Sequence, residues 1–403
     1  MLDEIDYLLI TALQHAPRAD WQRIGALLDV DATTAARRWA RLTDAGLAWL
    51  GCHPSPAATG ELIVAFIEVD CEPGRLHPVC EQLVDDAALF NIEHATGSRD
   101  LLLTAVFRSQ TELARYVGFR LGALPGIAAT RTQIATALHT EGSRWRLDRL
   151  KESGRPDGPR TRPAAPAATL GPADIDLVLL LGEDCRQSVS RLAERSGLST
   201  ATVRRRLARL EAANAIAYRC EAARSVSGWP VSATLWGAVP AAETARITAQ
   251  LSGMRETRLC ATLTGPHNLL FTVWLRSVGD IQPFEAALVQ RFPDLTIADR
   301  AVTLWQLKHA GHILDPAGRR LRTVPFTGMW NDGDTSVAET ALLDRLRTAG
   351  GTPVRHPGPP GTARREADRG HAAAAAPRGP GRADRGDAPV RNREAPGVVP
   401  HLA

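Results

Sequence analysis

The chain of 403 residues is poor in cysteine and lacks the patterns in which cysteine builds small stapled or zinc-binding folds. Its six cysteines stand singly, and none belongs to a CxxC pair. A disulfide framework needs paired cysteines, and a structural zinc site needs closely spaced ones. We therefore expect reduced thiols, most of them buried as small apolar side chains, and no metal site.

Long apolar runs are also missing. No segment approaches the ~20 apolar residues that a membrane-spanning helix needs. The chain begins MLDEIDYLLI, with acidic residues ahead of its apolar stretch, whereas a secretory signal begins with basic residues. These absences predict a cytoplasmic protein that has no membrane partner.

The sequence contains none of the motifs that mark common enzyme classes. We find no Ser-His-Asp order, no glycine-rich phosphate loop and no HExxH. The formal net charge of +4 does not by itself indicate nucleic acid, so the distribution of charge matters more. Between Arg186 and Arg209 there are seven arginines and one acid, Glu194.

The most informative feature is an internal repeat. Residues 1–140 match residues 169–308 at a constant offset of 168 positions, almost without gaps. The matched pairs include Asp6 and Asp174, Arg18 and Arg186, Arg41 and Arg209, Gly97 and Gly265, and Pro125 and Pro293. A constant offset over so long a span indicates two copies of one two-part unit.

The first part of each copy has the pattern of three short helices. In copy 1, Asp20 and Asp31 precede apolar stretches as N-caps, and Gly46 ends the third helix. In copy 2, Ser188 and Ser199 are the expected caps. Asn214 stands where Gly46 stands, and asparagine is the next-best residue for a left-handed helix stop.

The second part of each copy alternates strand and helix. Copy 1 predicts strands at 62–69, 89–96, 101–107 and 127–138, with helices at 76–84 and 111–121, and copy 2 follows the same order. The order βαββαβ is that of a ferredoxin-like sandwich. The predicted fold class is therefore α+β multidomain, with two winged-type helix-turn-helix domains alternating with two ferredoxin-like βαββαβ domains.

We divide the chain accordingly into six segments. The predicted helix-turn-helix domains are residues 1–52 and 173–220, the ferredoxin-like domains 60–140 and 228–308, the linker 151–172 and a low-complexity tail 315–403. The linker is rich in Pro, Gly and Ala. The tail is predicted to be disordered, apart from one amphipathic helix at 337–348.

A basic second helix in a helix-turn-helix pair suits the major groove of DNA. On the helix predicted at 200–213, the apolar seam leaves Thr200, Ala201, Arg204 and Arg205 free for bases and nearby phosphates. Arg206 and Arg209 lie further round the helix and suit a phosphate contact or an internal ion pair. The candidate DNA-binding residues of the poorer copy 1 surface are Thr33, Arg37, Arg38 and Arg41.

This combination resembles the leucine-responsive/asparagine-regulator (Lrp/AsnC) family of bacterial transcription regulators. The resemblance rests on LDEIDYLLITAL, on LSTATVRRRLARLEAANAIAY, and on a Gly-x-x-Asp turn that precedes LLLTAVF. It implies a regulator that binds double-stranded DNA and is modulated by an amino acid or a similar small effector, with no cofactor.

The family's effector site lies near the Gly-x-x-Asp turn, between neighbouring sandwich domains. Carried over, the resemblance implies effector-binding residues in both turns: Gly97, Ser98, Arg99, Asp100, Gly265, His267 and Asn268. Copy 2 has Asn268 in place of the acid, and Pro266 lacks a backbone donor, so the two sites are not expected to be equivalent. A plain hairpin connection would use the same residue types.

The family assembles twofold dimers, whereas this chain carries both units. We expect the two sandwich domains to pair within the chain, so that the two recognition helices bind half-sites of different sequence. The association of several such chains into a homo-oligomer is left open.

Two other classes of function stay open. Siroheme decarboxylases also resemble tandem Lrp/AsnC units, and an enzyme of that kind would draw on histidines such as His94, His139, His267, His309 and His312. A protein-interaction unit that has lost DNA binding would fit the first recognition surface but not the second.

Overall fold

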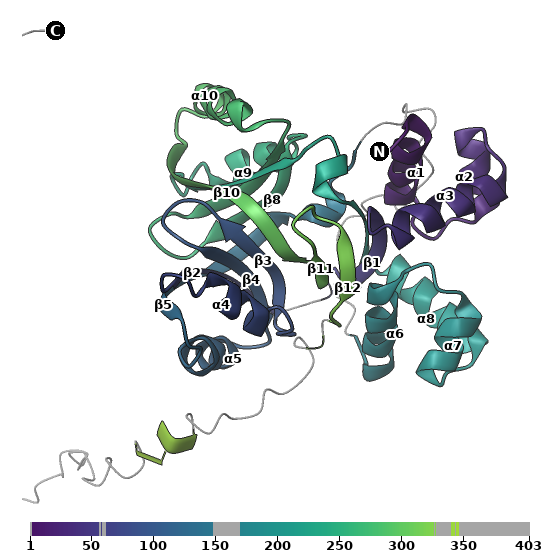
Figure 1. The fold of residues 1–403 in the computed structure, drawn as a ribbon, viewed down its shortest axis with the longest axis horizontal. Coiled ribbons are helices and arrows are strands. Elements are labelled where there is room, and N and C mark those ends of the chain that lie inside the picture. Colours follow the sequence, from purple (N-terminus) through teal and green to yellow (C-terminus); the bar gives the residue numbers. More distant parts are fainter. Residues whose placement is uncertain are drawn as a thin grey trace, which may run out of the picture. The chain divides into compact units, whose positions relative to one another are not determined.

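The computed structural model describes residues 2–55, 58, 62–147, 170–325, 327, 340–342 and 344–345, which belong to one compact unit, Met1–Thr348. The predicted disorder at 352–403 and most of the linker lie outside the described residues. None of the helices in the described part has the length and apolarity needed to cross a bilayer. Figure 1 shows helical domains beside a layer of strands, in keeping with the predicted mixture of helix and sheet.

Each copy begins with three helices, as the sequence predicts. Their bounds are α1 Glu4–His15, α2 Trp21–Leu28 and α3 Ala32–Asp44 in copy 1, and α6 Pro172–Glu183, α7 Val189–Ser196 and α8 Thr200–Ala212 in copy 2. Asp31 and Ser199 accept hydrogen bonds from the backbone N–H groups of Thr34 and Thr202, which confirms these N-caps.

The residues predicted to end the third helix of each copy are confirmed as well. Gly46 has φ 65° and Asn214 has φ 50°, the left-handed conformation that reverses a chain after a helix. The linker prediction extends slightly too far, because α6 begins at Pro172 and Leu170 already packs against the helical core.

A two-stranded ribbon joins the two helix-turn-helix domains. β1 (Ala48–Pro54) and β6 (Ile216–Ala222) pair antiparallel, with Gly51 opposite Arg219. These two residues are related by the repeat offset, so the centre of the ribbon lies on a local pseudo-twofold axis. We did not predict either strand. Nearly every residue of β1 is buried, so polar and apolar residues do not alternate along it.

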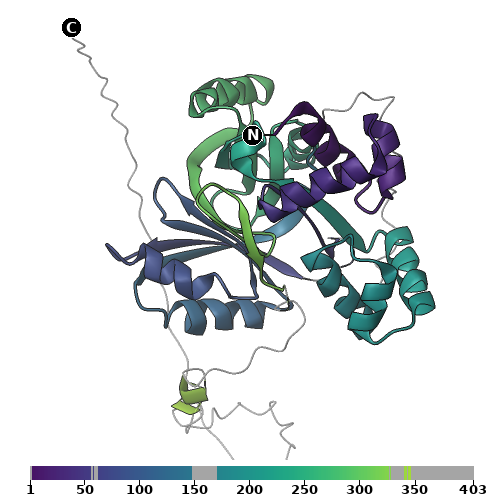
Figure 2. The ribbon, with the colours of Figure 1, turned by 45° about the vertical axis from the view of Figure 1, so that its right-hand side comes forward.

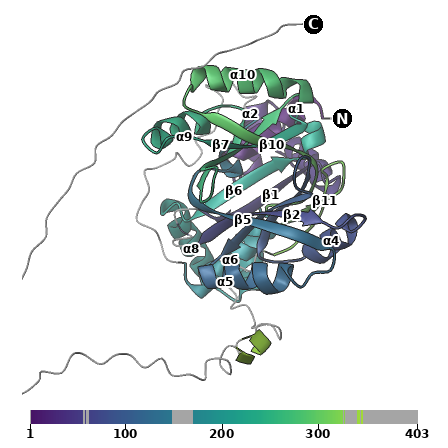
Figure 3. The same ribbon diagram turned by 90° about the vertical axis from the view of Figure 1, so that its left-hand side faces the viewer.

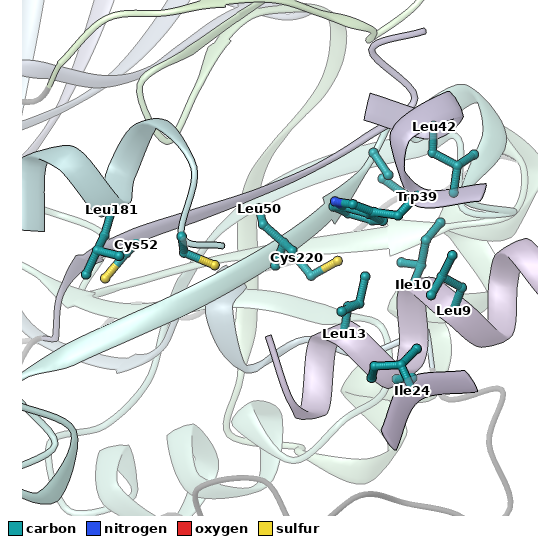
Figure 4. Close-up of a cluster of buried hydrophobic side chains, with 14 of the residues drawn as sticks. Leu9, Ile10, Leu13, Ile24, Trp39, Leu42, Leu50, Cys52, Leu181 and Cys220 are labelled. Carbon is teal, nitrogen blue, oxygen red and sulfur yellow. The ribbon is translucent and has the colours of Figure 1, made fainter. Parts of the chain in front are cut away.

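The two helical domains share one hydrophobic core. Leu9, Ile10, Leu13, Ile24, Trp39 and Leu42 approach the ribbon from copy 1, and Leu181 packs on it from copy 2 (Figure 4). Two arginines related by the offset cross the same boundary. Arg18 donates to the carbonyl of Cys185, and Arg186 donates to the carbonyls of Pro17 and Ala19 at 2.7 and 2.8 Å.

The sandwich domains contain eight main strands and four helical segments. In copy 1 they are β2 Ile63–Cys71, α4 Leu76–Leu83, β3 Leu89–Ala95, β4 Leu101–Phe107, α5 Gln110–Arg115, continued by the π-helix Tyr116–Leu121, and β5 Ile127–Thr140. In copy 2 they are β7 Val231–Ala238, α9 Thr244–Ser252, β8 Thr257–Leu263, β9 Leu269–Leu275, α10 Ile281–Arg291 and β10 Thr296–His309.

The strands pair across the two copies as well as within them. The order β3-β4-β2-β5 in copy 1 continues through β5–β8 into β8-β9-β7-β10, and β10 pairs back with β3. The ring of pairings is therefore closed. In Figure 3 the strands lie between α9 and α10 on one side and α4 and α5 on the other, and apolar clusters fill each helix–sheet interface.

The two junctions between copies have the same register. Ala135 pairs with Leu263 and Thr303 with Ala95, and each position in the second pair is related to one in the first by the repeat offset. The irregularities in the two junctions also fall at matching places. The expectation that the sandwich domains pair within the chain is met by these strand contacts.

The predicted low-complexity tail begins too early. β11 (His312–Leu314) and β12 (Arg320–Thr323) form a hairpin that extends the sheet from β10, seen as the light green strands in Figure 2. The backbone N–H of Arg320 also donates to the carbonyl of Gly46, 2.9 Å away. This hairpin was missed because β12, Arg-Leu-Arg-Thr, has no apolar run. Within the helix expected at 337–348, the described residues 340–342 and 344–345 are helical.

Candidate functional site

Helix α8 presents two arginines on its exposed face. Val203, Leu207 and Leu210 form its buried seam, and Arg204 and Arg205 lie exposed on the opposite side, as predicted. Within the described part of the chain, neither arginine forms an ion pair. Thr200 and Ala201 are exposed at the N-terminal end of the same helix. This arrangement suits contacts to base edges and flanking phosphates.

The other two arginines predicted on this helix form an internal ion-pair cluster. Arg206 Nη1 lies 2.8 Å from Asp174 Oδ1, and Arg209 bonds the second carboxylate oxygen. Asp174 is 2% exposed, so the two guanidinium groups fix the start of α6 against α8. Although burial works in the opposite direction, hydrogen bonds from Arg209 and Arg206 hold the pKa of Asp174 below its ordinary value of 3.8.

Copy 1 repeats this cluster at the matching positions. Arg38 Nη1 lies 3.0 Å from Asp6 Oδ1, and Arg41 Nη2 lies 2.6 Å from Asp6 Oδ2. Arg206 and Arg209 therefore have the internal ion pair that the sequence left open beside a phosphate contact, and the predicted DNA contacts of all four arginines stay predictions. Arg41 and Arg209 are about half exposed, so a phosphate contact by either one stays a prediction.

The exposed face of α3 is less basic than that of α8. Thr33 and Arg37 are exposed there, and Ala36 occupies the position of Arg204. Sequence reasoning missed one further pair of cations, Arg23 on α2 and Arg191 on α7, which are exposed and related by the repeat offset. Their matched positions in an otherwise divergent pair of helices were the available signal. The first helix of such a pair crosses the DNA backbone, where an arginine can meet phosphate.

The two turns that the resemblance singled out have closely matched geometry. Gly97 and Gly265 have φ 99° and 111°, which only glycine adopts readily. Asp100 Oδ2 accepts from the backbone N–H of Cys71 at 2.7 Å, and Asn268 Oδ1 accepts from that of Val239 at 3.0 Å. The side chain at this position therefore braces the end of a neighbouring strand in both copies.

The remaining residues of the turns differ between copies. Arg99 is buried, lies 4.0 Å from the ring centre of Trp236, and bonds Glu68 and Asp299. Ser98 is exposed, and His267 in the other turn is half-buried. Arg99 thereby links its turn to β7 and β10 of copy 2, so this turn lies between the two sandwich domains.

Comparison with known proteins agrees with this architecture. Residues 2–43 and 173–211 match the AsnC-type helix-turn-helix domain, and residues 64–144 match the Lrp/AsnC ligand binding domain. An uncharacterized HTH-type transcriptional regulator of Pyrococcus horikoshii is 30% identical over 142 residues, which cover 35% of this chain and 90% of the relative. The HTH-type transcriptional regulator FL11 of Pyrococcus abyssi is 26% identical over 141 residues, covering 35% and 93%.

One solved structure is similar over both copies. The siroheme decarboxylase NirDL, in co-complex with an iron-uroporphyrin III analogue, superposes with a TM-score of 0.53 and 11% identity, covering 86% of this chain and 99% of that one. At this identity the likeness concerns the fold alone.

The helical domains, with their exposed basic helix, and the βαββαβ domains define a helix-turn-helix protein with a ligand-binding type of partner domain. With the sequence matches, the chain belongs to the Lrp/AsnC family of HTH-type transcriptional regulators.

The Asp174 cluster gives a first prediction. Asp174→Asn removes the anion between two arginines, and we expect urea denaturation to show a free energy of unfolding lower by about 1–3 kcal/mol. Because the pKa of Asp174 is lowered, its pairing stabilises the fold at neutral pH and is lost as the pH falls through that lowered pKa. The variant should therefore lose less stability on acidification than the parent.

The matched control is Asp176→Asn on the exposed side of the same helix. An equal loss of stability in both variants would contradict the structural role of the Asp174 cluster.

Proposed function

We propose that this protein is a sequence-specific DNA-binding transcription regulator whose stronger reading element is α8. The observation that carries the proposal is that two of the arginines on this helix are ion-paired within the fold and two are exposed. Arg206 and Arg209 are engaged with buried Asp174, whereas Arg204 and Arg205 remain exposed beside the N-terminal end of the helix. An enzyme or a plain scaffold has no use for this exposed basic face.

The two copies would present unlike reading surfaces to one DNA duplex. The β1–β6 ribbon and the exchanged arginines Arg18 and Arg186 hold the two helix-turn-helix domains together. Copy 2 offers Ala201, Arg204 and Arg205 where copy 1 offers Thr33, Ala36 and Arg37. A pair of half-sites read by these surfaces need not be the same sequence.

We therefore expect the bound operator to be asymmetric. Genomic footprinting should give two half-sites of different sequence, and Arg37→Ala should weaken protection of one of them only. A strictly palindromic consensus, protected equally in both halves, would contradict the proposal that the copies read different sequences.

Removing the exposed arginines of α8 should weaken specific DNA binding. For Arg204→Ala/Arg205→Ala we expect a loss of about 1–3 kcal/mol for each base contact removed. Any phosphate contact removed should lower the slope of affinity against salt by about one. Mobility-shift titrations at several salt concentrations measure both. Arg291→Ala, on α10 of the sandwich, is the control, and undiminished binding by the double variant would refute the assignment.

We propose that an amino acid or a similar small effector binds at the turn of copy 1, near Gly97, Ser98, Arg99 and Asp100. Asp100 has a second carboxylate oxygen besides the one that braces Cys71, and this oxygen can pair with an ammonium group. In copy 2 the corresponding turn, with Gly265, His267 and Asn268, has an amide in place of the carboxylate, so we expect its affinity for the effector to be lower.

Copy 2 supplies the substitution that tests this site. Asp100→Asn copies the residue found in the other turn, where Asn268 keeps the strand-bracing hydrogen bond. We expect little change in melting temperature but loss of amino-acid binding in calorimetry. Amino-acid binding that survives the change would place the effector elsewhere.

We also propose that the protein works in the cytoplasm, and that several chains can associate beyond the intrachain pairing of the sandwich domains. The two-stranded ribbon and the strand ring are already complete within one chain, so any further association would use other surfaces. Sedimentation of the full chain would measure any further assembly.

A second candidate function follows from the likeness to the siroheme decarboxylase fold. Such an enzyme would use buried histidines, and His309 and His312 are 9% and 3% exposed. Both already have partners within the fold, Gln306 for His309 and Thr323 for His312. A tetrapyrrole absorbance band retained at stoichiometric level in the purified protein would favour the enzyme over the regulator.

A further inference from the structure

Both sandwich domains line a partly open cavity of about 160 Å³ within the ring of strands. Its walls are the inward-facing residues of both sandwich domains, among them Phe66, Leu102, Leu138, Leu270 and Trp274. Trp236 and Leu263 fill the adjoining part of the interior with apolar side chains. Engineered apolar cavities of similar volume accept a molecule the size of benzene.

Charged side chains gather at one end of this cavity. His53 on β1, Glu141 after β5, Arg219 on β6, Arg258 on β8 and His309 on β10 all line it. Arg219 Nη1 lies 3.6 Å from Glu141 Oε2, and His53 Nε2 lies 3.9 Å from the same oxygen. Four strands and the segment after β5 therefore position ionisable groups at the same end of the cavity.

The cluster has the repeat symmetry with its residue types exchanged. His53 and Glu221 are related by the repeat offset, and so are Glu141 and His309. In one half the ribbon carries the histidine and the closing strand's end carries the acid, and in the other half the reverse holds. His309 Nε2 lies 3.4 Å from Glu221 Oε1, so each copy keeps a histidine–glutamate pair although the residues have changed places. Such an exchange is expected where the structure needs a histidine–glutamate pair but not a particular residue at each of the two positions.

Two acids balance the two guanidinium groups of this cluster. Glu221 bonds Arg219 and Arg258 from behind and does not line the cavity, so of the two acids only Glu141 shares the cavity wall with the arginines. Burial lowers the pKa of His309 to about 4, so this imidazole is neutral. Burial also raises the pKa of Glu93, another lining residue, to about 7, so near neutral pH both its ionised form and its neutral form, which can donate a hydrogen bond, are present.

We propose that this cavity binds a small monocarboxylic acid with an apolar body of about one ring, its carboxylate on Arg219 and Arg258. Guanidinium groups are suited to hold carboxylates, and an apolar wall holds the rest of the molecule. Arg258 is fixed for this role because its guanidinium lies 3.8 Å from the ring centre of Trp274. The site is separate from the turns at Gly97 and Gly265, and it takes an anion without an ammonium group.

Calorimetry with benzoate as the probe tests this site on the full chain, without DNA. We expect one benzoate per chain, a raised melting temperature, and at least about tenfold weaker binding of benzamide, which has the same shape without the charge. No benzoate binding, or equal affinity for benzamide, would overturn the proposal.

Two variants locate the bound probe. Thr104→Phe places a ring in the cavity from β4 and leaves every charged residue unchanged, and it should abolish benzoate binding. Arg258→Met should weaken binding at least about tenfold, whereas Arg255→Met, the same change at an exposed arginine three positions earlier, should not. Benzoate binding that survives Thr104→Phe would overturn the assignment even if the Arg258 variant failed to fold.

The benzoate experiments test the cavity site independently of the proposed regulator function. Asp100→Asn should leave benzoate binding unchanged, and mobility-shift titrations report DNA binding separately. Benzoate binding without any DNA binding would defeat the regulator and keep the cavity site, and the converse would keep the regulator alone.

Discussion

The structure depends on the closure of the strand ring by two equivalent junctions. A ferredoxin-like sheet on its own leaves edge strands whose backbone groups need partners. Here β5 pairs with β8 and β10 with β3, so the edge strands of each copy are satisfied by the other. The cavity lies where this closure brings the two sandwich domains together, and the two-stranded ribbon and the shared helical core join the copies a second time.

The same closure explains why so many charged side chains are tolerated inside. Arg99, Arg219 and Arg258 are each at most 6% exposed, yet each has a partner from another element: Trp236 for Arg99, Glu141 for Arg219 and Trp274 for Arg258. Burying such groups without partners would cost several kcal/mol each. Arg99 of copy 1 has Trp236 and Asp299 of copy 2 beside it, and Arg219 of copy 2 has Glu141 of copy 1, so these two arginines draw on both copies.

Much of the local structure could be predicted from sequence, because its determinants lie within a few residues. The caps Asp31 and Ser199, the left-handed stops Gly46 and Asn214, and the strand Leu101–Phe107 all follow from short-range chemistry. The ribbon β1–β6 and the hairpin β11–β12 did not, since their strands are defined by partners that no local pattern reveals.

The functional assignments divide in a similar way. Arg204 and Arg205 were predicted because an apolar seam fixes which face of a helix is exposed. For Arg206 and Arg209 the sequence leaves two roles open, a phosphate contact or an internal ion pair, because the choice depends on how α6 packs on α8. The charged end of the cavity was not predicted at all, since it gathers single residues from strands far apart in the chain.

The ribbon's centre has a consequence for how such a protein can evolve. In a homodimer, any side chain on the twofold axis meets its own copy, so an arginine there would face another arginine. In this chain the two axial positions are encoded separately, and Arg219 stands opposite Gly51. A Cβ on Gly51 would lie 3.2 Å from His312 Nε2 and 3.3 Å from the carbonyl of Gly182, so a side chain there would require its neighbours to shift. With both axial positions in one chain, a buried arginine can stand on one side of the axis alone, an arrangement that two identical subunits cannot make.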